Sequence, residues 1–177
     1  VESAIGYISL TAVDNTVKAL TVEGVAPTAD NVRSGAYKIA RPFLMLTKTG
    51  VTLSAAAQDF YNYCMSTTVK KTIEADGITT SDFNTRAEYT VPETALSGEV
   101  TIKGSSSMKI LMTTLVEDYK TLCGSKVANV TFVQSYPSSA DGRTAVKDST
   151  NTGSVIGVAS SSKADAGYEE HTLCLDA

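Results

Sequence analysis

The sequence has few of the residues on which metal and disulfide chemistry depend. Its 177 residues include three cysteines, one histidine and no tryptophan. A structural zinc site needs about four ligands at characteristic spacing, and the chain has no CxxC pair, so we expect no such site. An odd, sparse set of cysteines is not a disulfide framework. Pairing of two of the three stays open, but buried thiols at Cys64, Cys123 and Cys174 are the simpler expectation.

Excess positive charge and long apolar runs are also lacking. Fifteen basic and nineteen acidic residues give a net charge of −4. Nucleic acids and anionic membranes bind basic patches, so neither is an expected partner. No run reaches the roughly 18 apolar residues of a membrane span. The chain is long enough for one domain with a core, and it opens on Val1 without a signal-type segment, so we expect a processed or trimmed chain.

The hydrophobic pattern alternates between strand-like and helix-like segments. Strands are predicted at Ala4–Leu10, Val17–Val22, Arg41–Thr47, Glu99–Lys103, Val127–Val133, Ser154–Ala159 and His171–Asp176. Helices are predicted from Pro27 to about Gly35, from Leu53 to Gly77 and from Met108 to Gly124. A further helix is predicted to follow the turn at Tyr136–Ser139 and to run through about Lys147, and a short one is predicted at Ser162–Tyr168. Residues 79–98 lack periodicity and are predicted to be a linker or surface connection. The alternation predicts an α/β domain whose central, mostly parallel sheet is flanked by helices.

Serines recur where three predicted strands end and the next helix begins. They lie at residues 105–107, 138–139 and 160–162. In a parallel sheet, ligands bind at the carboxyl ends of the strands, and a helix N-terminus attracts anions through its free N–H groups. One such serine is most simply an N-cap. Recurrence at three strand ends instead favours a site for a small oxyanion.

Several segments resemble the substrate-binding proteins of phosphate ABC transporters. The opening strand, serine turn and helix of that family read like TIxGSTSxxPLxxxLxxxY, and here the corresponding segment is VTIKGSSSMKILMTTLVEDYKT. The family's second strand with its GSSxG turn is similar to VTFVQSYPSSADGRTAV, its DIGxASR segment to GSVIGVASSS, and its outgoing strand to HTLCLDA. Its return segment and closing helix resemble AIGYISL…VKALTVEGVAPTADNVRSGAYKIARPFLMLTKTG and LSAAAQDFYNYCMSTTVKKTIEADG.

The order of these segments is inverted relative to the family. Residues 1–78 resemble its C-terminal part, residues 99–177 resemble its N-terminal part, and residues 79–98 join the two. The resemblance therefore implies a single, circularly permuted domain of the type II periplasmic-binding-protein kind at 1–177, with the family's second domain absent. Tandem repeats in a parent chain are one source of such an order, and an engineered permutation is the other. A polar linker between neighbouring termini makes permutation physically tolerable.

The resemblance also implies a set of phosphate contacts. The matching positions are Ser106, Ser107, Ser138, Ser139 and Ser160. The family's remaining ligands, an arginine and a GSGT-type turn, belong to its second domain, and no equivalent is identified in this sequence.

Two departures from the family pattern affect the predicted site. Pro137 replaces the expected glycine, and Asp141 resembles an insertion whose charge would repel an anion. Some relatives carry an acidic residue at the position of Ser160, which accepts the proton of phosphate, whereas a hydroxyl stands here.

The function implied is extracytoplasmic capture of inorganic phosphate, or a similar oxyanion, for an ABC transporter permease. The partners implied are that permease and either the second domain or a neighbouring repeat; no cofactor is implied. One alternative is a structural repeat of a cell-surface protein that no longer binds an anion. The other is a serine acyl-enzyme of the penicillin-recognising type, in which Ser106-x-x-Lys109 supplies the nucleophile, Lys48-Thr-Gly50 resembles a KTG motif and Ser81-Asp-Phe-Asn84 a broken SDN. The reversed order of these motifs counts against the enzyme.

Overall fold

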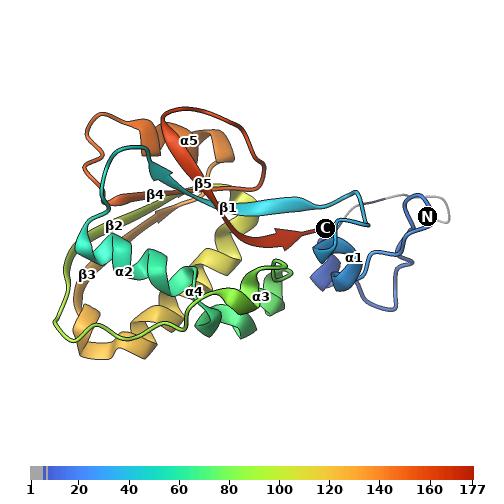
Figure 1. Cartoon of the computed structure of the whole chain (residues 1–177), viewed down its shortest axis with the longest axis horizontal. Helices are drawn as coiled ribbons and strands as arrows, with labels where there is room; N and C mark the ends of the chain where they lie inside the picture. The colour runs from blue at the N-terminus through green and yellow to red at the C-terminus, as the bar shows by residue number, and fades with distance from the viewer. Residues whose placement is uncertain (1–5, 7) are drawn as a thin grey trace.

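The core of the molecule is a five-stranded sheet with the strand order β3-β2-β4-β1-β5. The computed structural model describes residues 6 and 8–177, and Figure 1 shows the sheet between two layers of helices. The strands are β1 Arg41–Lys48, β2 Ser97–Gly104, β3 Asn129–Ser135, β4 Val155–Ala159 and β5 Tyr168–Asp176.

Four of the five strands run in the same direction. β2 pairs in parallel with both β3 and β4, whereas β1 pairs antiparallel with β4 and with β5. β1 is therefore the one reversed strand, and the prediction of a mostly parallel sheet is confirmed. Continuous burial of Phe43–Leu46 in β1 fits a strand that is covered on both faces.

Helices cover both faces of the sheet. They are α1 Ala29–Arg33, α2 Ala55–Cys64, α3 Lys70–Asp76, α4 Lys109–Cys123 and α5 Ser139–Lys147, with 3-10 turns at Leu10–Ala12, Thr67–Val69, Phe83–Thr85, Ser106–Met108 and Gly124–Val127. In Figure 1, α2, α3 and α4 lie below the sheet and α5 lies above it. The larger hydrophobic core lies between the sheet and the face covered by α2, α3 and α4. A smaller core lies under α5 and is built from Leu44, Leu46, Val146, Ala159 and Tyr168. In the described part of the chain, no helix combines the length and apolar character that crossing a bilayer requires.

The helix predicted from Leu53 to Gly77 is two helices. Ser66 interrupts it. The hydroxyl of Ser66 donates to the carbonyl of Tyr63 (2.7 Å) and accepts from the N–H of Thr68 (3.2 Å). These side-chain hydrogen bonds take the place of helical backbone hydrogen bonds. Gly77 does end α3, as predicted, but in extended backbone. A side chain at this position would be crowded, because a Cβ there would lie 3.0 Å from the carbonyl oxygen of Leu175.

Residues 79–98 are more than a surface connection. Phe83 is only 1% exposed within a 3-10 turn, Thr79 and Thr80 are buried, and β2 already begins at Ser97. The guanidinium of Arg86 donates to the carbonyl of Leu173 and to that of Thr172 in β5. The segment is therefore packed into the domain, which its polar composition did not predict.

The described residues that precede β1, residue 6 and residues 8–40, form a small N-terminal lobe beside the C-terminus (Figure 1). The predicted strand at Ala4–Leu10 lies partly outside the described residues, and Leu10 begins a 3-10 turn. The predicted strand at Val17–Val22 is wrong, since only an isolated bridge from Val22 to Val25 forms. The predicted α1 is confirmed, and Thr28 caps it by accepting from the N–H of Asn31 (3.2 Å).

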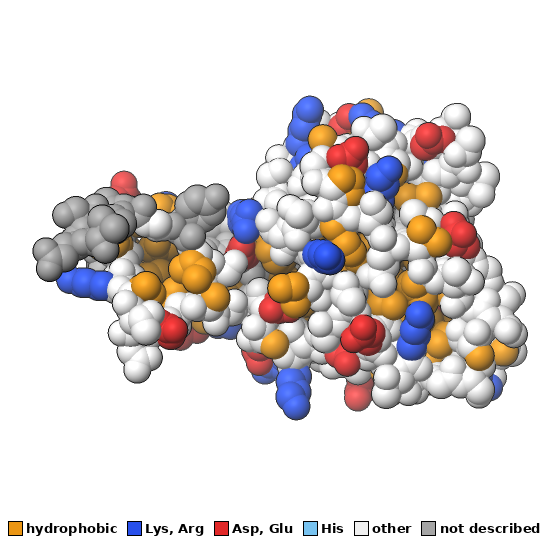
Figure 2. All heavy atoms as spheres, turned by 180° about the vertical axis from the view of Figure 1, so that it is seen from behind, with side chains coloured by type: hydrophobic (Ala, Val, Ile, Leu, Met, Phe, Trp, Pro, Cys, Tyr) orange, Lys and Arg blue, Asp and Glu red, His pale blue; other side chains and the backbone are white. Residues whose placement is uncertain are grey.

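This lobe exposes much of its apolar surface. Figure 2 shows apolar side chains gathered on it, while charged side chains of both signs are scattered over the larger body. Four of the exposed large apolar residues belong to it, namely Ile8, Val17, Leu20 and Ile39.

Candidate anion-binding site

The carboxyl ends of β2, β3 and β4 meet at one edge of the sheet. Gly104 at the end of β2 pairs with Val158 near the end of β4, and Lys103 pairs with Ser135 at the end of β3. The serine-containing turns that follow these three strands therefore start side by side, as the sequence predicted.

Three serine hydroxyls, one from each turn, form a cluster at this edge. Ser105 donates to the hydroxyl of Ser160 over 3.0 Å, and the hydroxyls of Ser139 and Ser160 are 3.5 Å apart. The backbone N–H of Ser160 donates to the hydroxyl of Ser139 (3.2 Å). Ser105 is 3% exposed, whereas the other two are half-buried. The cluster thus has a buried base and an accessible side.

Two glycines allow the elements to approach closely enough for this contact. Gly104 has a φ of +154°, and a Cβ there would lie 1.9 Å from the carbonyl oxygen of Val158. A Cβ on Gly142 in α5 would lie 2.7 Å from the carbonyl oxygen of Lys103. The first turn of α5 therefore packs directly on the strand ends, which brings Ser139 to Ser160.

Ser138 is the N-cap of α5. Its hydroxyl accepts from the N–H of Asp141 (3.2 Å) and also donates to the carboxylate of Asp141. This pair stabilises the start of the helix, although the carboxylate accepts from the hydroxyl of Ser138 and not from its N–H as in a capping box. Asp141 is thus part of the first turn of α5, and its carboxylate is the acceptor for one of the predicted phosphate-binding hydroxyls.

Ser106 and Ser107 lie in the 3-10 turn that leads into α4. Both are exposed, and neither this turn nor α4 has a side-chain N-cap. The N–H groups of Met108 and Lys109 donate to the carbonyls of Ser105 and Ser106, so the free donors at this end belong to the start of the 3-10 turn, at Ser106 and Ser107. The predicted donors at this turn are therefore accessible. Ser105 was not among the predicted site residues, although the position of Ser105 directly after Gly104 indicated that it would lie closest to the strand end.

The third turn differs from the prediction. Ser160 follows β4, but the predicted helix at Ser162–Tyr168 is wrong, because a loop leads directly into β5. Ser162 donates to the carboxylate of Glu170 (2.5 Å), and the hydroxyl of Tyr168 donates to the carbonyl of Lys163 (2.5 Å). These contacts fold the segment back on β5, so Ser160 has no helix dipole behind it.

The motifs of the acyl-enzyme alternative do not converge. Lys48 ends β1, and the antiparallel pairing with β4 puts that end of β1 beside the start of β4. Its ammonium group donates to the carbonyls of Asp148 (2.7 Å) and Asn151 (3.2 Å). Ser106 lies just beyond the carboxyl end of β2, which is about 10 Å from the level of Lys48 when measured along the strands. The lysine of the KTG sequence therefore holds a turn at the opposite edge.

The cysteines have the properties of core residues. All three are free and buried. Burial raises the pKa of the Cys64 thiol well above its ordinary value, and it raises the pKa of Cys174 to about 12. Neither is a reactive thiolate at neutral pH.

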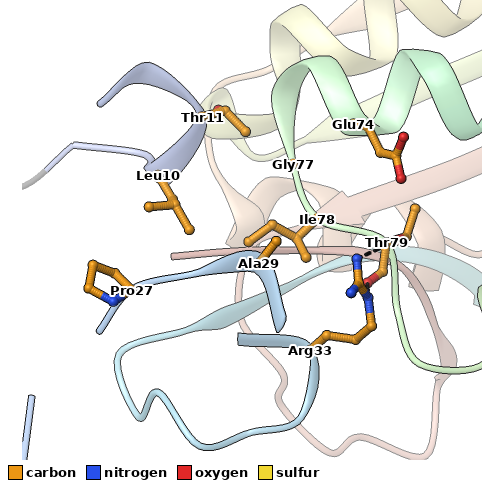
Figure 3. Close-up of a pocket in the computed structure, with 9 residues that line it drawn as sticks. All are labelled: Leu10, Thr11, Pro27, Ala29, Arg33, Glu74, Gly77, Ile78 and Thr79. Carbon is orange, nitrogen blue, oxygen red and sulfur yellow. Dashed lines mark hydrogen bonds between the residues drawn. The ribbon is translucent and has the colours of Figure 1, made fainter. Parts of the chain in front are cut away.

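Two hollows lie away from the serine cluster. One of about 440 Å³ separates the N-terminal lobe from α3 and residues 77–79 (Figure 3). Its arginine, Arg33, donates to Asp30 (2.7 Å) and twice to Thr79 (3.1 Å each), so its charge is already paired. The second, of about 420 Å³, lies between α2 and residues 87–90.

The hydroxyl and helix N-terminal donors at the ends of adjacent strands define a candidate anion-binding α/β domain. Comparisons with known proteins identify its relatives. No family model matches the sequence. The chain is 38% identical over 117 residues to Phosphate-binding protein PstS 2 of Streptococcus agalactiae, which aligns 66% of this chain and 38% of that protein. It is 37% identical over 154 residues to the protein of the same name from Streptococcus pneumoniae, with 84% and 48% aligned.

A solved structure gives the same result. The crystal structure of a phosphate-binding protein of a phosphate ABC transporter from Streptococcus pneumoniae superposes with a TM-score of 0.81 at 30% identity, over 96% of this chain and 62% of that one. The chain is therefore homologous to the phosphate-binding proteins of ABC transporters, and the predicted resemblance is confirmed. It spans about half the length of the curated relatives that it matches.

Proposed function

We propose that the chain contributes one half of a binding site for inorganic phosphate in a protein that serves an ABC importer. The observation that carries this proposal is the contact of Ser105, Ser139 and Ser160 at the ends of three adjacent strands. The relatives' names supply the identity of the anion. A tetrahedral oxyanion suits such an edge, because it accepts several hydrogen bonds at once and favours the positive ends of helices.

The donors fall into three groups, one for each strand end. Ser106 and Ser107 offer hydroxyls and N–H groups at the start of α4. Ser138 and Ser139 do so at α5, and Ser160 adds a hydroxyl from the loop. The carboxylate of Asp141 holds the hydroxyl of Ser138 in the free protein. Binding therefore requires that this contact loosen, or that the anion donate a hydrogen bond to the carboxylate of Asp141, which a protonated phosphate can do and sulfate cannot.

The other half of the site belongs to a second domain or a neighbouring repeat. The exposed apolar surface of the N-terminal lobe supports this, because large apolar patches mark interfaces. The inverted segment order is in turn explained by a circular permutation in which residues 79–98 join the old termini. The parent reading frame tests both ideas. AIGY-type and GSSS-type segments repeated in tandem would support a natural permutation, and a single copy in the family order would contradict it.

The same homology supports a location and a partner for the protein. We place the protein outside the cytoplasmic membrane, with an ABC transporter permease as its partner, and we assign it no catalytic role. Tight capture in two-domain binding proteins involves closure around the ligand. The chain alone is therefore expected to bind phosphate more weakly than the complete parent.

Isothermal titration with phosphate, on this chain and on its complete parent, tests the proposal. Binding by the parent that is lost when Ser106 and Ser138 are both replaced by alanine would support it. An absence of binding by both proteins would favour the structural repeat, an alternative to which the Ser138–Asp141 contact lends weight. Covalent labelling of Ser106 by a β-lactam would instead favour the acyl-enzyme.

A further inference from the structure

Arg143 is an arginine whose positive charge is not balanced by a neighbouring carboxylate. The chain has four arginines, and Arg33, Arg41 and Arg86 each lie within ion-pair distance of an aspartate. Among residues 6 and 8–177, no acidic side chain lies within that distance of Arg143. Its Nε is also buried and has no hydrogen-bond partner there. Among the described residues the Nε of Arg86 also has no hydrogen-bond partner, but it lies 3.7 Å from the carboxylate of Asp82, whereas Arg143 has no such carboxylate.

The position of Arg143 connects it to the serine cluster. It lies on α5, one turn after Ser139, so the two side chains share a face of the helix. One terminal nitrogen donates both to the carbonyl and to the hydroxyl (3.2 Å) of Ser161, the residue directly after Ser160. Arg143 therefore holds the one strand-end turn that lacks a helix.

A neighbouring lysine provides an internal comparison. Lys147, one turn further along α5, reaches the same loop and donates to Asp165 over 2.6 Å. Its charge is thereby balanced within the loop. Arg143 makes its contact through a neutral serine, so the net charge of the guanidinium remains available to an anion.

We propose that Arg143 is the cationic member of this oxyanion site, an assignment that rests on the proposed function. Its terminal nitrogen fixes the turn at Ser160 and Ser161, and its positive charge attracts the bound anion. A guanidinium prefers oxyanion oxygens because they accept charge-assisted hydrogen bonds from its fixed N–H donors. The half-site in this chain thus carries its own arginine, which the sequence did not reveal.

A phosphate titration of the ¹⁵N-labelled chain, followed by NMR, tests this assignment. The signals to follow are the Nε–H of Arg143 and the backbone N–H groups of Ser139 and Ser160. The variants are Arg143→Gln, Arg143→Lys and a matched control, Lys71→Gln, which removes one exposed positive charge from α3 on the other side of the sheet. A parallel urea titration of each variant measures its stability.

The expected result is that all three signals move together and saturate with phosphate. Arg143→Gln should then weaken binding about tenfold or more, Arg143→Lys should weaken it less, and Lys71→Gln should change it less than about twofold. If the serine signals respond but Arg143→Gln binds as tightly as the original chain, this assignment is wrong and the proposed function stands. If no signal at the three strand ends responds to phosphate, both are wrong. Weaker phosphate binding by Arg143→Gln at an unchanged urea midpoint distinguishes a role at the anion from a role in loop stability alone.

Discussion

The hydroxyl of Ser105 donates a hydrogen bond to the hydroxyl of Ser160 over 3.0 Å, although 55 residues separate them in the chain. This contact joins the end of β2 to the end of β4. Because the strands are parallel, both hydroxyls lie at the edge where α4 and α5 begin. The hydrogen bond therefore reports directly on whether the strand-end turns assemble as one site.

Replacing Ser160 by alanine should weaken phosphate binding without unfolding the domain. The change removes one hydroxyl from the cluster, and one lost hydrogen bond to an anion corresponds to about a tenfold loss of affinity. Calorimetry on the parent protein measures the effect. Ser149→Ala, at an exposed turn between α5 and β4, is the matched control and should bind as before. Equal affinity of the two variants would remove Ser160 from the site.

Replacing Gly142 by alanine should destabilise the domain. The added Cβ would lie 2.7 Å from the carbonyl oxygen of Lys103 and 2.9 Å from that of Val158, so α5 must move away from the strand ends. Overpacking of this kind costs about 1–3 kcal/mol in the free energy of unfolding. Urea unfolding measures the loss, and Thr144→Ala, at an exposed position two residues further along α5, is the control. An unchanged midpoint for Gly142→Ala would show that α5 does not pack as described.

Replacing Tyr89 by phenylalanine should cost about 1 kcal/mol of stability. The hydroxyls of Tyr89 and Tyr119 both donate to one carboxylate oxygen of Asp59, each over 2.6 Å. Burial and these hydrogen bonds raise the pKa of both tyrosines, which keeps them protonated as donors at neutral pH. Tyr89 thereby fixes the linker segment to α2 and α4.

The double-mutant cycle of Tyr89→Phe with Tyr119→Phe measures how the two hydroxyls share this acceptor. Because they donate to the same oxygen, the two losses should not be additive. Tyr37→Phe serves as the control for loss of a hydroxyl in the N-terminal lobe. Strict additivity, with no loss for Tyr89→Phe, would contradict the shared contact.

His171 should make the domain less stable as the pH falls. Burial lowers the pKa of His171 from 6.5, and its Nε2 lies 2.9 Å from the hydroxyl of Thr47. The unfolded chain then binds a proton more readily than the folded one. The contribution of His171 is therefore complete above about pH 6.5 and declines below it. The difference in unfolding free energy between the original chain and His171→Gln, measured from pH 7.5 to 5, should shrink toward acid pH; a constant difference would contradict the lowered pKa.

Much of the fold was predictable because the sequence encodes it locally. The apolar stripe from Met108 to Tyr119 and the glycine at Gly124 correctly located α4, and the apolar run at Arg41–Thr47 located β1. The errors arose where side chains override periodicity. Ser66 divides a helix through its own hydrogen bonds, and Phe83 supplies a buried anchor within a polar segment.

The candidate site was predictable in position but not in composition. Parallel strand ends must share an edge, so the sequence placed the three serine turns together. It could not assign the contacts within the cluster, because those depend on the approach permitted by Gly104 and Gly142. Arg143 was missed because its significance lies in what it does not contact, and pairing partners are visible only in three dimensions.

A crystal of this chain soaked with arsenate, a tetrahedral analogue of phosphate that scatters anomalously, tests whether the strand-end turns form one anion site. We expect one arsenate, located by its anomalous peak next to the start of α4, with oxygens within hydrogen-bonding distance of Ser139 and Ser160. A saturating soak that leaves this edge empty, or that places arsenate only at the hollow beside Arg33, would contradict this expectation.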